Sequence, residues 1–207
     1  MSEAAMDSPT SGHAGGHGHN FSPAFHKERA NWRGFGMWLF LGQEIMFFTA
    51  FFSAYIVVRS AAVESVAMPL DKTLGALNTL VLITSSLTMA LAVAFSRKGD
   101  RKATGNWLLA TFALAGVFMV VKSIEYSSHF AHHVFPSSDI FHAFYYLLTG
   151  FHGLHVLGGM IALAILWWRN RRGDFDEHYN DPIFITGLYW HFVDLVWIFL
   201  FPGLYLL

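Results

Sequence analysis

The sequence predicts an all-α fold, a polytopic membrane bundle of five transmembrane helices. Hydrophobic residues make up 54% of the 207 residues and charged residues only 13%, whereas a soluble domain usually carries about 25% charge. Five apolar runs are each long enough to cross a hydrocarbon core of about 30 Å. The net charge of −1 argues against a nucleic-acid partner. The lack of cysteine excludes disulfides, thiolate metal sites and cysteine nucleophiles.

The first 30 residues have a different composition from the rest of the chain. They are rich in glycine, serine and histidine, which predicts a flexible cytoplasmic tail at 1–30 ahead of a five-helix transmembrane domain at 31–207. The tail holds no apolar core of signal-peptide length, so we expect no cleaved signal. Because histidine titrates near neutral pH, proton collection by this tail is one hypothesis.

The five apolar runs differ in the polar residues that they contain. In chain order they cover residues 34–58, 73–95, 106–125, 141–168 and 183–207. The first holds a single charge, Glu44, and the second holds none. The third ends with Lys122 and Glu125, the fourth has histidines but no charged residue, and the fifth holds His191 and Asp194. Short linkers leave no room for a second domain.

Lysine and arginine are distributed unevenly between the two sides of the predicted bundle. Ten of the 13 lie on the side of the N-terminus, at positions 27, 29, 33, 97, 98, 101, 102, 169, 171 and 172. Basic residues concentrate in cytoplasmic loops. The sequence therefore predicts a multi-pass membrane protein with a cytoplasmic N-terminus and a C-terminus that faces the periplasm or its equivalent.

Five polar side chains are predicted to share one layer near the middle of the membrane. At about 1.5 Å of rise per residue they lie roughly 13–20 Å from the cytoplasmic ends of their helices. They are Glu44, His152, His155, His191 and Asp194. His152 and His155 are spaced i,i+3, as are His191 and Asp194, so the two members of each pair are expected to lie on the same face of their helix. An intramembrane charge needs a partner or water, so the layer predicts contacts between the first, fourth and fifth helices.

This layer has more than one interpretation. It can be an interhelical hydrogen-bond clamp, it can move protons, or it can hold a metal. A di-iron bundle needs paired Glu-x-x-His motifs, and the sequence has none. His129, His132 and His133 match a desaturase-type box, but the box occurs once and on the non-cytoplasmic side, so we expect a solvated loop there. His155 and His191 could serve as axial haem ligands only in an open pocket, and Phe and Trp crowd their helices.

Lys122 and Glu125 stand three residues apart near the outer interface. This spacing predicts a local ion pair, with the lysine ammonium snorkelling toward water.

Several motifs resemble subunit III of the haem–copper oxidases. They are YYLLTGFHGLHV at 145–156, YWHFVDLVWIF at 189–199, GQEIMFF at 42–48, EY at 125–126 and PSSD at 136–139. They occur in the family's order and cover about residues 32–207. Mitochondrial members of this family have seven helices, and the resemblance covers the last five.

The resemblance implies an accessory role without a catalytic, cofactor or metal site in this chain. A subunit III packs on subunit I, which holds the haems and copper, and contacts other oxidase subunits. It also binds phospholipid, supports proton uptake and protects the enzyme during turnover. Carried over by motif, the family-matching polar positions are Glu44, Glu125, His152, His155, His191 and Asp194.

The electron donor is not fixed by these residues. The form of the last-helix motif favours cytochrome c, and the alternatives are a quinol oxidase subunit or a homologue associated with nitric oxide reductase. A free-standing membrane metalloenzyme and a small transporter are more distant alternatives. A transporter usually shows internal repeats, and the sequence has none that we can detect.

Overall fold

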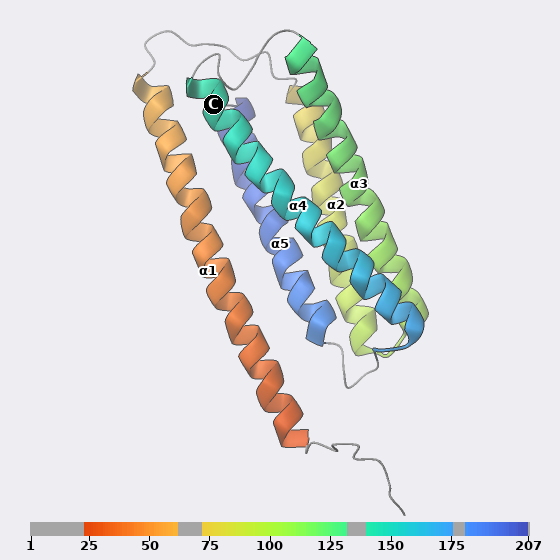
Figure 1. The fold of residues 1–207 in the computed structure, drawn as a ribbon. Helices are drawn as coiled ribbons and strands as arrows, with labels where there is room; N and C mark the ends of the chain where they lie inside the picture. Colours follow the sequence, from red (N-terminus) through yellow and green to blue (C-terminus); the bar gives the residue numbers. More distant parts are fainter. Residues whose placement is uncertain (1–22, 62–71, 132–139, 176–180, 207) are drawn as a thin grey trace, which may run out of the picture.

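The structure is a computed structural model that describes residues 23–61, 72–131, 140–175 and 181–206. These residues form five α-helices and a terminal π-helical turn: α1 (Pro23–Ala61), α2 (Lys72–Arg97), α3 (Arg101–Ala131), α4 (Ile140–Arg172), α5 (Asp181–Phe201) and η1 (Pro202–Leu206) (Figure 1). Each α-helix contains a segment long and apolar enough to cross a membrane. The predicted all-α fold with five spans is confirmed.

All five helices extend beyond their predicted apolar runs at one end or both, α1 and α3 by the most. α1 begins at Pro23 rather than at Gly34, and α3 continues past Glu125 to Ala131. Proline is well suited to a first helical turn, and no proline or glycine lies between Pro23 and Gly34. Hydropathy marks only the membrane-spanning part of such a helix. Residues 1–22 of the predicted tail lie outside the described residues, whereas 23–30 belong to α1.

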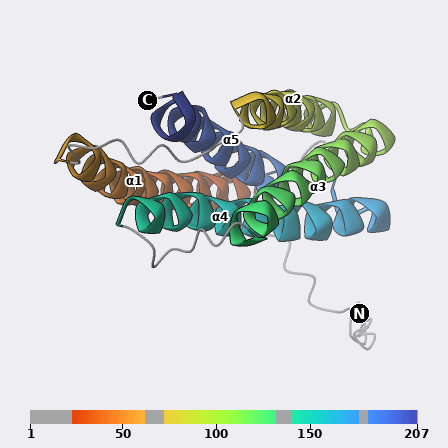
Figure 2. The ribbon, with the colours of Figure 1, turned by 90° about the horizontal axis from the view of Figure 1, so that it is seen from above.

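Four of the helices close into a ring. α2 packs on α3, α3 on α4, α4 on α5 and α5 on α2, while α1 packs against α4 and α5. Seen from above, α1 and α5 lie on the same side of α4, and α3 crosses α4 obliquely (Figure 2). α5 is therefore the central helix, and half of its span is buried compared with 22% for α1.

Two glycines with positive φ end helices at the same end of the bundle. Gly99 has φ 72° in the turn after α2, where the Asp100 N–H bonds the Phe95 carbonyl. Gly173 has φ 86° after α4, where the Asp174 N–H bonds the Arg169 carbonyl. Side-chain-bearing residues rarely adopt such φ values. These turns bring the ends of α2, α3 and α4 together.

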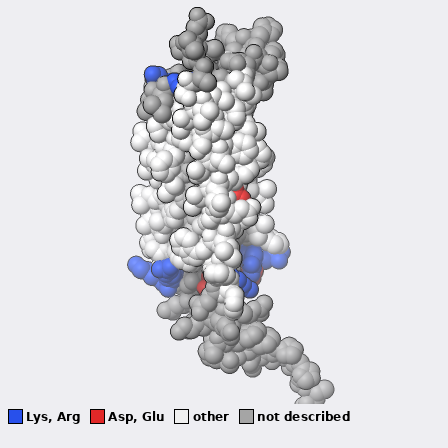
Figure 3. All heavy atoms as spheres, turned by 90° about the vertical axis from the view of Figure 1, so that its left-hand side faces the viewer, with Lys and Arg blue, Asp and Glu red and all other residues white. Residues whose placement is uncertain are grey.

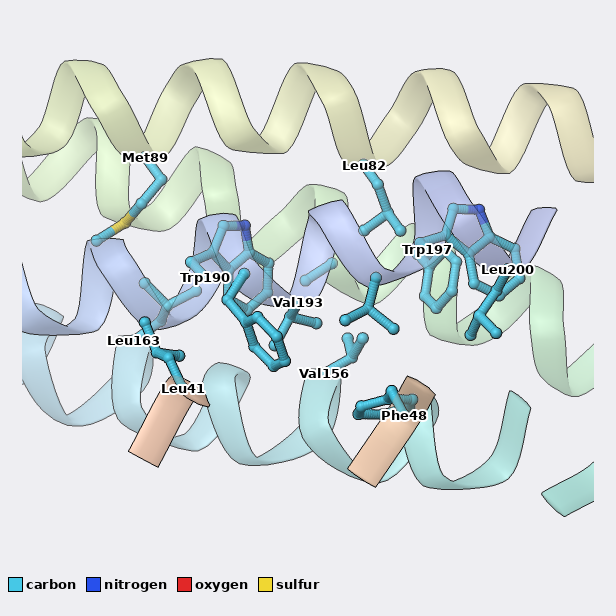
Figure 4. Packing of buried hydrophobic residues seen from close by; sticks show 14 of the residues in the cluster. Leu41, Phe48, Leu82, Met89, Val156, Leu163, Trp190, Val193, Trp197 and Leu200 are labelled. Carbon is cyan, nitrogen blue, oxygen red and sulfur yellow. The ribbon is translucent and has the colours of Figure 1, made fainter. Parts of the chain in front are cut away.

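The apolar core lies along α5. Trp190, Val193 and Trp197 are fully buried, and they point between α2 and α4 together with Leu82, Val156 and other side chains (Figure 4). Many large apolar side chains on the outside of the helices are exposed. This is the pattern of a bundle whose outer surface faces lipid.

Basic side chains gather at one end of the bundle (Figure 3). They come from the end of α2, the start of α3 and the end of α4, and comprise Arg97, Lys98, Arg101, Lys102, Arg169, Arg171 and Arg172. The long central band of the visible surface is almost free of charge.

Candidate functional site: polar groups between the helices

The structure divides the predicted polar layer into separate groups. Glu44 and His155 form a pair across α1 and α4, which we call the Glu44 pair. His191 and Asp194 turn toward Ser86 of α2, and we call these three residues the His191 group. His152 belongs to neither group. The predicted contact between the first and fourth helices is present, but the fifth helix directs its polar residues to α2.

The Glu44 pair is held by three contacts of the His155 imidazole and one contact of the His155 backbone carbonyl. His155 Nε2 lies 3.1 Å from Glu44 Oε2, and His155 Nδ1 lies 2.8 Å from the Phe151 carbonyl oxygen. The Tyr189 hydroxyl donates to the His155 carbonyl oxygen at 3.0 Å, and the Phe48 ring packs edge-on against the imidazole. The pair is thus fixed by α1, α4 and α5 together.

The Nδ1 contact restricts where protons sit in this pair. A carbonyl oxygen only accepts, so His155 Nδ1 must carry a hydrogen. The contact between Nε2 and Glu44 then contains one hydrogen, which is on the imidazole of an ion pair or on the carboxyl of a neutral pair. Both forms have zero net charge and keep the hydrogen bond. Such a pair can pass one proton between its members without leaving a lone charge in the membrane.

His152 and His155 contact different neighbours of α4, His152 packing against α3 and α5 and His155 against α1. The prediction that His152 and His155 face the same way was wrong. An i,i+3 step rotates about 300° around the helix axis, so the two side chains point about 60° apart, which is enough to place the two rings in different grooves. The His152 ring packs 5.1 Å from the Trp197 ring and 5.8 Å from the Phe118 ring. Within the described part of the chain neither ring nitrogen has a hydrogen-bond partner.

The His191 group fastens α5 to α2. Ser86 Oγ lies 2.7 Å from His191 Nδ1. Ser86 is also a polar neighbour of the buried Asp194 carboxyl, although neither Asp194 oxygen has a well-formed hydrogen bond to a described residue. Along the same seam the Trp190 indole donates to Ser85 at 3.1 Å. These contacts support the clamp interpretation for α5.

A second polar group surrounds Lys122 and consists of Lys122, Glu125, Tyr145 and Tyr205. We call it the Lys122 cluster. Lys122 Nζ lies 3.1 Å from Glu125 Oε2, 2.7 Å from the Tyr205 hydroxyl and 3.3 Å from the Tyr145 hydroxyl. Both tyrosines in turn donate to Glu125 Oε1, Tyr145 at 2.7 Å. The predicted ion pair is present.

The expectation that Lys122 snorkels toward water was wrong. Lys122 is 7% exposed and Glu125 8%, and three acceptors satisfy the three ammonium hydrogens. Four aromatic rings lie 5.0–5.5 Å from Nζ, those of Tyr126, Tyr145, Trp197 and Tyr205. The acceptors and π faces around the ammonium offset the cost of removing this cation from water. The cluster ties η1 to α3 and α4.

Sequence reasoning missed the partners that complete these groups. Ser86, Tyr145, Tyr189 and Tyr205 are ordinary membrane-helix residues in a sequence, since serine packs well and tyrosine is common at interfaces. Their position along the membrane normal could have indicated Tyr145 and Tyr205 as partners of Lys122, because all three residues lie near the same end of the bundle. Nothing local in the sequence indicates Ser86.

The described residues contain no group of three or more His, Cys, Asp or Glu side chains able to hold a metal. In the desaturase-type box, His129 falls within α3, while His132 and His133 lie outside the described residues. His155 and His191 are directed to different helices, α1 and α2, respectively.

The chain was compared with known families and proteins. The sequence model of the family described as "Cytochrome c oxidase subunit III" matches residues 24–207. A cytochrome c oxidase subunit 3 from Alkalihalophilus pseudofirmus is 33% identical, covering 88% of this chain and 92% of that protein. A probable cytochrome c oxidase subunit 3 from Mycobacterium bovis is 34% identical, covering 86% of this chain and 89% of that protein.

A third relative, from Synechocystis, is a cytochrome c oxidase subunit 3 that is 35% identical over 92% of this chain and 79% of its own length. The names of these relatives favour cytochrome c oxidase over the quinol oxidase and nitric oxide reductase alternatives. Together with the five apolar helices, the match also argues against a free-standing metalloenzyme or transporter. The chain belongs to the cytochrome c oxidase subunit III family and is an accessory, multi-pass membrane subunit of that oxidase.

Proposed function

We propose that this chain packs on the catalytic subunit I, which holds the haems and copper, and there supports proton uptake and protects activity during turnover. It has no redox centre of its own, and it binds membrane phospholipid. The observation that carries the proton role is the geometry of the Glu44 pair, in which His155 Nε2 lies 3.1 Å from Glu44 Oε2 while His155 Nδ1 lies 2.8 Å from the Phe151 carbonyl oxygen.

Position supports a role for this pair beyond helix packing. The Glu44 side chain is 12% exposed and the His155 side chain 17%, so the pair reaches the outer surface of the bundle, where a packed partner subunit would contact it. It lies between α4 and α1, the helix at the margin of the ring. His152, by contrast, is sealed within the core. An ionisable residue inside a membrane is costly and usually serves transport of ions or protons.

We expect Glu44→Ala to leave the oxidase assembled but to speed its loss of activity during turnover severalfold. Removing the carboxyl abolishes the shared hydrogen without opening the α2–α5 ring. The measurement is oxygen consumption by the purified complex over repeated turnovers, with subunit content checked on a gel.

Glu44→Gln is the matched variant that separates the two interpretations of this pair. The glutamine amide can still donate a hydrogen bond to His155 Nε2, but it cannot exchange a proton. If proton exchange matters, Glu44→Gln decays as fast as Glu44→Ala. If Glu44→Gln keeps wild-type decay, the pair is a clamp and the proton role is rejected.

We further propose that the basic end of the bundle faces the cytoplasm of a bacterial cell, in the plasma membrane, with the C-terminus outside. The support is the clustering of Lys and Arg at that end. Because the chain has no cysteine, a single introduced cysteine is the only thiol of this chain that a maleimide can label, and its labelling reports the side of the membrane on which it lies.

In intact cells or right-side-out vesicles, Ser60→Cys at the end of α1 should react with a membrane-impermeant maleimide, and Lys98→Cys should react only after the membrane is permeabilised. Both positions are exposed in the structure. Labelling is read from the gel band of this chain. The reverse pattern would overturn the orientation.

A further inference from the structure

A cavity of about 630 Å³ lies between the start of α3 and the end of α4, at the basic end of the bundle. Four cationic side chains line it, and no described lining residue is acidic. They are Arg101, Lys102, Arg171 and Arg172. In the described part of the chain none of the four takes part in an ion pair, and the neighbouring Arg169 is the one that pairs with Asp174.

The wall of this cavity is held by partly buried hydrogen bonds. Asn170 is 5% exposed and donates through Nδ2 to the Arg101 carbonyl at 2.8 Å. Arg101 donates through Nε to the Phe175 carbonyl at 2.9 Å. A Cβ on Gly105 would lie 2.9 Å from Asn170 Nδ2. This glycine therefore allows α3 and α4 to approach closely beside the cations.

Aromatic rings orient two of the guanidinium groups. The Arg171 guanidinium lies 4.9 Å from the Trp167 ring centre, and the Arg172 guanidinium lies 3.4 Å from that of Trp168. Stacking covers one face of each guanidinium and leaves its N–H edges free to donate. The cavity thus offers positioned donors and positive charge, the chemistry that recognises a phosphate.

The other end of the cavity is apolar. Leu109 lines it and is 48% exposed, and at 1.5 Å per residue it lies about 12 Å along α3 from Arg101. Trp167 lines the same cavity from α4. A basic rim that continues into an apolar groove on a membrane helix matches a headgroup followed by its acyl chains, whereas a free phosphate would not use the apolar end.

We propose that this cavity binds an anionic phospholipid, with its phosphate held by Arg101, Lys102 and Arg171 and the start of its acyl chains against Leu109 and Trp167. The inference assigns a site to the bound phospholipid of the proposed function. Its test measures lipid occupancy rather than activity, so its failure leaves the result for Glu44 unaffected.

The test uses the intact oxidase in nanodiscs of phosphatidylcholine, to which a photoactivatable phosphatidylglycerol is added. Labelling of the gel band of this chain gives the concentration for half-maximal labelling. Because each Lys or Arg contributes about fivefold to binding of anionic lipid, Lys102→Gln/Arg171→Gln should raise that concentration about thirtyfold. Arg97→Gln/Lys98→Gln is the matched control, since it removes two charges from the same end but outside the cavity.

Asn106→Trp provides a second variant that keeps every charge. Asn106 is exposed and lines the cavity, so the larger ring should fill the space and reduce labelling without unfolding the helix. Unlabelled phosphatidylglycerol should compete, whereas phosphatidylcholine and millimolar inorganic phosphate should not.

Three results would overturn the proposal. Equal losses in the cavity variant and its matched control would mean that only general surface charge attracts the lipid. Displacement of the probe by inorganic phosphate would mean that the site takes a free anion. Absence of saturable labelling in the wild-type oxidase would mean that the cavity binds no anionic phospholipid.

Discussion

Lys122→Met is expected to destabilise the chain by about 3–5 kcal/mol, because it removes one partner of a buried, hydrogen-bonded ion pair and leaves the Glu125 carboxylate without its cation. Tyr145 and Tyr205 would lose an ammonium donor at the same time. The measurement is the free energy of unfolding in an SDS titration followed by circular dichroism.

The double variant Lys122→Met/Glu125→Leu tests the reason for this loss. It removes both charges, so it should recover part of the stability that the single variant loses. Lys72→Met is the control for loss of a positive charge at the same end, because Lys72 is exposed, and it should be nearly neutral. A single variant as stable as the wild type would contradict the burial of Lys122.

Gly159→Ala is expected to cost about 1–3 kcal/mol through overpacking. A Cβ at this position would lie 2.7 Å from the ring of Trp190, which is fully buried between α4, α5 and α2 and cannot move away. The result is checked by the temperature at which half of the chain, carrying an N-terminal fluorescent protein, leaves its monodisperse gel-filtration peak.

The adjacent glycine gives a matched control for Gly159→Ala. A Cβ on Gly158 would meet the Tyr189 hydroxyl at 3.7 Å, an ordinary contact. Gly158→Ala should therefore leave the transition temperature unchanged or raise it slightly, because alanine favours helix. Equal effects of the two substitutions would show that α4 does not pack on Trp190 as described.

The helical segments could be predicted because spanning a membrane leaves few options for the backbone. Each span needs about 20 apolar residues with internal hydrogen bonds, so hydropathy located all five. The same argument could not locate the start of α1, because residues 23–33 are helical without being apolar. Its signals are proline at the start and good helix formers, which hydropathy does not weigh.

The polar contacts were only partly predictable. Depth along the helix placed Glu44 and His155 in one layer with three other residues, and the structure brings these two into contact. Depth does not determine the rotation of a helix about its axis, which separated His152 from His155 and turned His191 toward Ser86. Packing of the large rings on α5 determines that rotation, and it depends on all five helices at once.

The burial of Lys122 was missed for a related reason. An isolated lysine near a helix end has water within reach and is expected to snorkel. Here Tyr145 and Tyr205 come from α4 and η1 to form its surroundings, and they lie 23 and 83 residues away in the chain. Such long-range partners become visible only when the helices are assembled.

The central claim is that this chain is an accessory subunit that rests on a haem-bearing catalytic subunit. The most direct measurement is the molar ratio of haem to this chain in material isolated in mild detergent through a tag on its N-terminal tail. We predict a constant, stoichiometric ratio, with the haem absorbance eluting together with the chain. Recovery of the folded chain as a single peak without any haem absorbance would contradict the claim.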